Sequence, residues 1–135
     1  MRHFLSLAAV TALIPCFGGN LLLNSSFEMG TAGWGIMNQV PKVDGKYQAL
    51  RVFSASDAVH GTASLELRNP DGQHVQLCSP AIPVTPGETY TFSVWLKASE
   101  PMSAELRLFS PIDNRWHVVS RKLDITTGWK RCEFS

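Results

Sequence analysis

The chain has 135 residues, of which 44% are hydrophobic, and a formal net charge of +1. This length suits one domain with one sizeable hydrophobic core. The near-neutral charge and the lack of a basic run argue against a nucleic-acid surface, which needs clustered Lys and Arg. Ten Gly and eight Pro are spread along the chain, and such frequent turn residues favour β structure.

Residues 1–19 have the pattern of a secretory signal peptide: a short basic start, an apolar run over residues 5–17, and two closing glycines. The run is shorter than the roughly 20 apolar residues of a membrane span. We therefore predict a signal-peptide helix that is removed, no membrane attachment afterwards, and a folded domain over residues 20–135. An N-terminal core helix is the alternative. A lipid anchor at Cys16 is not expected, because Pro15 occupies a position that needs a small residue.

Two cysteines, Cys78 and Cys132, follow the predicted signal peptide. An exported protein can join them in a disulfide, and two unpaired thiols are the alternative. Neither cysteine has a second Cys or a His at the spacing that a zinc site needs. The sequence leaves the pairing open and predicts no zinc.

The first half of the domain contains short predicted strands at residues 21–23, 48–53, 63–68 and 73–78. Phe27 and Trp34 follow the first of these strands, and we expect both rings to anchor a polar loop in the core. The tetrapeptide Asn-Pro-Asp-Gly at 69–72 is a hairpin signal, with Pro at the second turn position. It predicts that the strands on either side of it pair with each other.

The clearest pattern lies at residues 83–99. The tetrapeptide Thr-Pro-Gly-Glu at 85–88 has Pro and Gly where a type II turn requires them. A strand with strict two-residue alternation follows, and its predicted inward residues are Tyr90, Phe92, Val94 and Leu96. Trp95 is a large aromatic on the opposite, otherwise polar face. That mismatch is the sharpest functional signal in the sequence.

The second half continues with strands predicted at residues 104–109, 115–123 and 129–135. In the first of these, Arg107 is predicted to face outward; in the second, Val118 and Trp116 are assigned to the core side, with His117 and Arg121 opposite. Short alternating strands with turns between them, and no helical periodicity beyond the signal peptide, predict an all-β sandwich. The chain ends in strand-like residues, so we expect a domain that is incomplete at its C-terminal end.

Three stretches resemble, in order, the carbohydrate-binding modules of the family 4/9 type. They are Asn20-Leu21-Leu22 with Asn24, Phe27-Glu28, Gly30 and Trp34; the stretch His60 to Leu65; and Val84 to Ala98 followed by Thr127-Gly128-Trp129. The resemblance implies a galactose-binding-like jelly-roll β-sandwich whose concave sheet binds sugar chains. It also implies a structural calcium ion held by Glu28, although the chain ends before the family's closing strand with its Asp pair.

Sugar recognition requires a flat aromatic face against the apolar side of a pyranose ring, and polar side chains for its hydroxyls. Trp95 is the predicted platform, and Tyr47 is a candidate for the rim of a cleft. The predicted hydrogen-bonding residues are Gln76, Arg107, His117 and Arg121. The alternative is a solvated sheet face with Trp95 under a loop. The other three tryptophans are assigned structural roles.

We therefore expect a secreted, periplasmic or cell-surface protein that binds polysaccharide or oligosaccharide without catalysis, in a longer parent protein with a catalytic domain. The carboxylates show no spacing that indicates a glycosidase pair, and no nucleophile-elbow motif is present. Two alternatives stay open: a structural or adhesive sandwich with no sugar site, and an accessory fragment of a larger glycoside hydrolase.

Overall fold

The computed structural model describes residues 3–13, 20–37, 42–43, 46–47, 50–54, 57–69, 76–112 and 115–135. The strands in these ranges are β1 (His3–Leu13), β2 (Gly35–Met37), β3 (Lys42–Val43), β4 (Lys46–Tyr47), β5 (Leu50–Ser54), β6 (Ser64–Asn69), β7 (Gln76–Cys78), β8 (Thr91–Ala98), β9 (Met102–Ile112), β10 (Arg115–Ile125) and β11 (Lys130–Phe134). Turns and loops make up the rest of the described chain. None of it forms a helix with the length and hydrophobicity of a membrane span.

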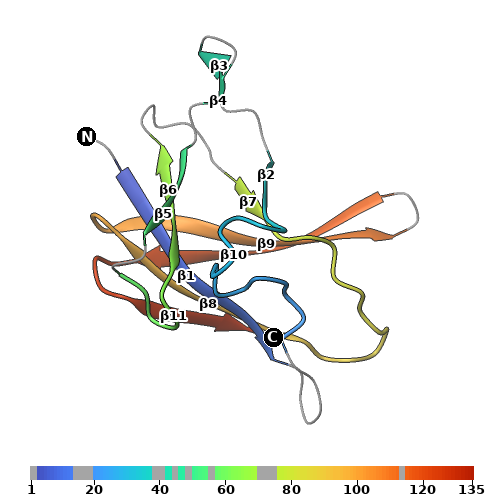
Figure 1. The fold of residues 1–135 in the computed structure, drawn as a ribbon. Coiled ribbons are helices and arrows are strands. Elements are labelled where there is room, and N and C mark those ends of the chain that lie inside the picture. The colour runs from blue at the N-terminus through green and yellow to red at the C-terminus, as the bar shows by residue number, and fades with distance from the viewer. Residues whose placement is uncertain are drawn as a thin grey trace.

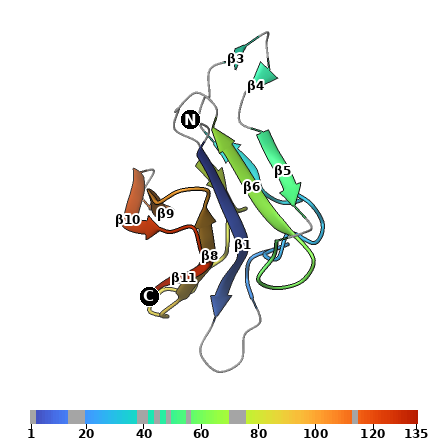
Figure 2. The ribbon, with the colours of Figure 1, turned by 90° about the vertical axis from the view of Figure 1, so that its left-hand side faces the viewer.

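One layer is a five-stranded antiparallel sheet in the order β11-β8-β1-β6-β5, called the main sheet below. The long β9–β10 hairpin and the short β2–β7 pair are separate two-stranded sheets, and β3 and β4 form a small ribbon. Figures 1 and 2 show the hairpin lying to one side of the main sheet and extending past it. The prediction of an all-β sandwich is confirmed.

The core lies between the main sheet, the base of the β9–β10 hairpin and the loop over residues 20–34. Its fully buried members include Phe27, Leu65, Val94, Leu96 and Ile125. Strands β6 and β8 contribute every second residue to it, because successive side chains of a strand point to opposite faces. The other face of the main sheet is therefore free to carry polar and aromatic groups.

Strand β8 follows the predicted alternation. Val94, Leu96 and Ala98 are 2–4% exposed on the core side, whereas Trp95 and Lys97 are half-buried on the opposite side. Ahead of the strand, the type II turn is also confirmed. Gly87 has a φ of 87°, which only glycine adopts without strain, and the Glu88 N–H donates to the Thr85 carbonyl at 3.2 Å.

The strand predicted at residues 21–23 is wrong, because this stretch forms turns. The Asn20 side-chain oxygen accepts the Leu22 N–H at 3.0 Å, and such local bonds compete with strand ladders. The anchoring role of the two aromatics is confirmed: Phe27 and Trp34 are buried with ring centroids 5.2 Å apart. The Trp34 indole N–H donates to the Asn24 carbonyl at 3.2 Å.

Residues His3–Leu13 are strand β1 in the middle of the main sheet, where β6 and β8 offer two hydrogen-bonding edges. The helix expected of a signal peptide stays a prediction. Cleavage of residues 1–19 stays a prediction. Cys16 lies outside the described residues.

One predicted pairing is corrected. Strand β6 pairs with β1 and β5, and β7 pairs with β2, so residues 63–78 are not a hairpin. Most of the predicted turn lies outside the described residues.

In β10, Val118 is 49% exposed and Ile125, of opposite parity, is 2% exposed. The core-side assignment of Val118 is therefore wrong. Valines occur on both parities of this strand, so alternation alone could not choose the buried face.

Candidate functional site

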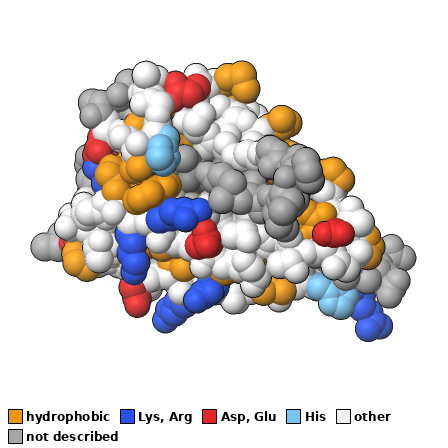
Figure 3. Space-filling model, turned by 90° about the horizontal axis from the view of Figure 1, so that it is seen from below, with side chains coloured by type: hydrophobic (Ala, Val, Ile, Leu, Met, Phe, Trp, Pro, Cys, Tyr) orange, Lys and Arg blue, Asp and Glu red, His pale blue; other side chains and the backbone are white. Residues whose placement is uncertain are grey.

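The aromatic residue that the sequence singled out lies within a cluster of charged and aromatic groups on the outer face of the main sheet. Its members come from strands β8 and β11, the residue before β11 and the loop before β6. They are called the outer patch below: Asp57, His60, Trp95, Lys97, Trp129, Arg131 and Glu133. Figure 3 views the molecule from below, where β8 and β11 lie in Figure 1. It shows basic, acidic, histidine and apolar side chains close together on that face.

Strand register brings these residues together. Arg131 lies directly opposite Trp95, and Glu133 lies opposite Ser93. Residues directly opposite each other in an antiparallel pair share a face, at about 5 Å between their Cβ atoms. Arg131 and Glu133 therefore lie on the same face of the main sheet as Trp95. This placement depends on a pairing between segments that are more than 30 residues apart.

Trp129 is fixed by two contacts. Its indole N–H donates to Asp57 Oδ1 at 2.9 Å, and the other Asp57 carboxylate oxygen forms an ion pair with Lys97 Nζ. The same Lys97 ammonium lies 5.1 Å from the centroid of the Trp129 ring, a cation–π distance. Asp57 thus links the loop before β6 to Trp129, the residue that precedes β11, and to Lys97 on β8, and the Trp129 ring has a defined orientation.

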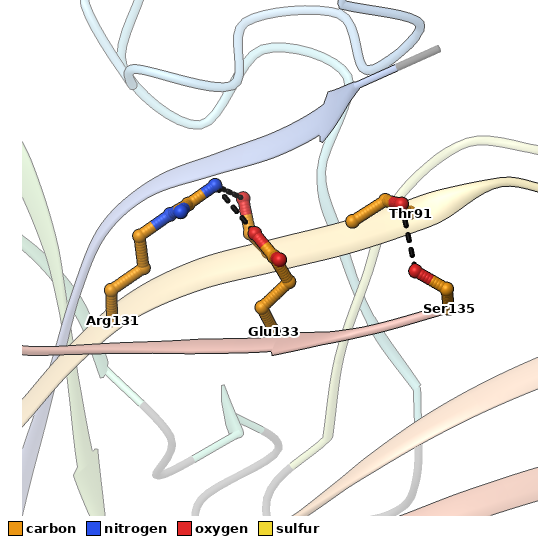
Figure 4. A network of polar contacts seen from close by, with 5 residues as sticks. Thr91, Arg131, Glu133 and Ser135 are labelled. Atoms are coloured by element: carbon orange, nitrogen blue, oxygen red, sulfur yellow. Dashed lines mark hydrogen bonds and ion pairs between the residues drawn. The ribbon is translucent and has the colours of Figure 1, made fainter. Parts of the chain in front are cut away.

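Trp95 is half-buried, and its ring and that of His60 form a T-shaped pair, with centroids 5.9 Å apart and an interplanar angle of 73°. Next to it, Arg131 Nη2 lies 2.6 Å from Glu133 Oε2 and donates to Ser93 Oγ at 3.3 Å. Figure 4 shows Arg131 and Glu133 projecting from β11 beside β8. The guanidinium and the carboxylate thus lie at Ser93, two residues along β8 from Trp95.

The same figure shows how the end of the chain is attached to the sheet. The hydroxyls of Thr91 and Ser135 are 2.8 Å apart, within hydrogen-bonding distance. Phe134 contacts Phe92 with ring centroids 5.8 Å apart. These contacts support the β11–β8 register on which the outer patch depends.

The predicted ligand-binding residues are not gathered in one place. Trp95 belongs to the outer patch, but Gln76 lies on β7 in a different sheet, where its amide donates to Cys78 Sγ at 3.6 Å. Arg107 lies on β9 and bonds to Glu105 at 2.5 Å. Cys78 and the buried Cys132 both carry free thiols.

His117 and Arg121 lie on the opposite face of the β9–β10 hairpin from Arg107. Arg107 is in register with Ser120, whereas Arg121 is in register with Leu106. Tyr47 lies on the two-residue strand β4, in a ribbon separate from the main sheet. Alternation predicts the two faces of each strand, but it does not predict which strands share a sheet.

Sequence reasoning missed six members of the outer patch: Asp57, His60, Lys97, Trp129, Arg131 and Glu133. One signal was available, because Trp129 and Arg131 share parity in the last predicted strand. Two alternating residues, one aromatic and one cationic, on a face otherwise polar would have marked β11 as part of a binding face. The pairing of β11 with β8 was needed to connect that face to Trp95.

Glu28, the predicted calcium ligand, joins two loops. Its Oε1 accepts backbone N–H groups from Thr62 at 2.7 Å and Ala63 at 3.1 Å, and its Oε2 accepts the Thr62 hydroxyl. The Thr62 side-chain and backbone hydrogen bonds are the main causes that lower the pKa of Glu28 below its ordinary value. A Cβ added to Gly61 would lie 2.1 Å from Glu28 Oε1, so the loop needs glycine there.

This arrangement does not fit a calcium site. Ca²⁺ takes six to eight oxygen ligands, and the Glu28 oxygens are directed at donors of Thr62 and Ala63. Among the described residues, no group of three His, Cys, Asp or Glu side chains is placed to hold a metal ion. The described residues around Glu28 form a structural clamp between loops.

A family model described as a carbohydrate binding domain matches residues 19–135. The chain belongs to this family. No match was found among curated proteins or among solved structures. Membership in the family assigns the domain a carbohydrate ligand, and the match covers the main sheet apart from β1.

Proposed function

We propose that this carbohydrate-binding domain holds its sugar on the outer patch, with Trp95 as the stacking platform. The observation that carries the proposal is that Trp95 lies on the outer face of the main sheet, half-buried beside Arg131 and His60. A half-buried indole is held in place by its neighbours and still presents part of its ring. That combination suits the apolar face of a pyranose.

The polar groups around the indole supply the second requirement. The guanidinium of Arg131 carries several N–H donors in a planar fork, and the carboxylates of Glu133 and Asp57 accept hydrogen bonds. Adjacent sugar hydroxyls act both as donors and as acceptors. The Arg131–Glu133 and Lys97–Asp57 ion pairs leave the patch close to neutral, which supports an uncharged sugar as its ligand.

We further propose that binding is non-catalytic and takes place outside the cytoplasm. The carboxylates of Asp57 and Glu133 are engaged in ion pairs, which suits hydrogen bonding to hydroxyls better than general acid catalysis. The signal-peptide pattern of residues 1–19 supports export. The ligand is then a polysaccharide or a soluble oligosaccharide, and a linked catalytic domain is the expected parent context.

The test is binding of the Trp95→Ala variant to a panel of immobilised polysaccharides and soluble oligosaccharides. Truncation of an aromatic side chain at the centre of a binding site lowers the binding free energy by about 2 kcal/mol or more. The affinity for the sugar should therefore fall by about 30-fold. The matched control is Phe109→Ala. Phe109 is 41% exposed on β9, away from the outer patch, and its variant should bind like the parent.

Thermal unfolding of both variants separates binding from folding. The melting temperature of Trp95→Ala should stay within a few degrees of the parent. Unchanged affinity in a folded Trp95→Ala protein would refute the proposal, and loss of binding in Phe109→Ala alone would move the site to the hairpin. A parent protein that binds no sugar on the panel would favour the structural or adhesive alternative.

A further inference from the structure

The main sheet contains a strand from outside the family-matched region. The match covers residues 19–135, whereas β1 comprises His3–Leu13 and lies between β6 and β8. Without β1, both neighbours would have an unpaired ladder edge, and the sheet would be divided into β11–β8 and β6–β5. Open edges of this kind bind any compatible strand, including those of other molecules.

The register of β1 matches its neighbours in polarity on both sides. Leu5 is opposite Leu67 and Ala98, and Leu7 is opposite Leu65 and Leu96. These four partners on β6 and β8 are buried core residues. Between these two leucines, Ser6 is opposite Glu66 and Lys97, which lie on the outer face. A set of residues directly opposite one another across the sheet forms a row, which is a core row or an outer row according to the face it lies on. Apolar positions of β1 therefore lie in core rows, and a polar position lies in an outer row.

An irregularity in the ladder preserves this match along the strand. The β1–β8 register shifts between Leu7 and Val10, after which Val10 is opposite the core residue Val94. Such a β-bulge changes which parity of a strand faces the core. Leu7 and Val10 are thus both in core rows, although they are an odd number of residues apart. Thr11 then lies opposite Ser93 in an outer row.

We propose that the gap between β6 and β8 is a strand-acceptor site and that residues 3–13 of this chain are its occupant. The same apolar segment has the pattern of an export leader. Within one molecule, residues 3–13 cannot both be removed as an export leader and fill the gap, because their removal leaves β6 and β8 with unpaired edges. A molecule that retains the segment has a continuous five-stranded main sheet.

A pair of matched substitutions tests this in the full chain, produced in the cytosol so that residues 1–19 are kept. Leu7→Asn places an amide in a core row, and Ser6→Asn places the same amide in an outer row. Leu7→Asn should lower the melting temperature by about 10 °C or more, and Ser6→Asn by a few degrees at most. Equal, small effects of the two substitutions would overturn the proposal.

If Leu7→Asn fails to fold while Ser6→Asn folds, the segment is required, as proposed. Hydrogen exchange on the unmodified chain gives an independent measurement. The amides of residues 3–13 should be protected to a degree similar to those of β8. Rapid exchange over residues 3–13 together with a protected β8 would show that the segment does not occupy the gap.

A cleavage experiment tests whether the contact persists without the covalent link. A protease site inserted between Gly18 and Gly19 allows the folded chain to be cut. The released peptide should co-elute with residues 19–135 in gel filtration, whereas the peptide from the Leu7→Asn chain should separate. A wild-type peptide that separates and leaves a remainder with an unchanged melting temperature would contradict the proposal.

Discussion

At the scale of single residues, Glu28 forms a closely fitted contact with the loop at residues 61–63. A carboxylate that accepts hydrogen bonds from Thr62 and Ala63 is stabilised in its charged form. Gly61 makes the close approach sterically feasible, at a φ of 71°. The contact between these two loops thus depends on the Glu28 charge, on the backbone donors of Thr62 and Ala63, and on the lack of a side chain at Gly61.

This contact predicts a pH-dependent contribution to stability. The lowered pKa of Glu28 means that the folded state favours the charged carboxylate. Its stabilisation is complete above the ordinary value of 4.5 and is lost as the pH falls through the lower folded value. Glu28→Gln should therefore lower the melting temperature at pH 7, and the difference should shrink in acid.

Thermal unfolding of the parent and of Glu28→Gln between pH 3 and pH 7 measures this difference. Glu88→Gln is the matched control, because Glu88 is an exposed carboxylate in the turn before β8. It should change the melting temperature little at any pH. A Glu28→Gln difference that is the same at pH 3 and pH 7 would show that the carboxylate charge does not contribute.

At the scale of elements, the β9–β10 hairpin has a buried base and an exposed end. Ile125, at the base, is 2% exposed and packs in the core, whereas Val119, six residues earlier on the same face, is 62% exposed. The hairpin extends past the main sheet in Figure 1, and Met102, Ala104 and Leu123, which pack against the core, lie near its base. Position along the strand, and not only parity, decides burial.

Matched truncations on this one face should have unequal effects. Ile125→Ala should lower the free energy of unfolding by about 3 kcal/mol, because it removes buried methylenes and leaves a cavity. Val119→Ala should change it by about 0.5 kcal/mol or less. Urea unfolding of both variants gives the comparison, and equal losses would mean that the far end of the hairpin is also covered in solution.

At the scale of the whole molecule, the outer patch and the core occupy opposite faces of the same strands. Strand β8 contributes Val94 and Leu96 to the core and Trp95 and Lys97 to the patch. A sugar bound to the patch therefore binds only the folded protein, and ligand binding must raise its stability. The core fixes the geometry of the patch by fixing the register of β8 with β11.

The expected size of that linkage can be measured. A bound oligosaccharide at 100 times its dissociation constant stabilises by about 2.7 kcal/mol, which corresponds to a rise in melting temperature of about 10 °C. Trp95→Ala should show almost no rise at the same sugar concentration. A full rise in that variant would place the sugar elsewhere on the molecule.

The sequence by itself determined the strand pattern of β8, the turn before it, the buried pair Phe27 and Trp34, and the sandwich class. These follow from local chemistry: two-residue alternation, the φ values that Pro and Gly favour, and the burial of large aromatic rings. The family resemblance that these residues carried is confirmed by the match over residues 19–135. All of this information lies within short stretches of chain.

Only the tertiary structure decided which strands are neighbours. It placed Arg131 beside Trp95, linked Asp57 to Trp129, put Arg107 and Arg121 on opposite faces of a hairpin, and inserted residues 3–13 between β6 and β8. The physical reason is that strands pair through backbone N–H and C=O groups, which are the same whatever the side chain. Pairing is chosen by the burial of whole faces, which involves residues far apart in the chain.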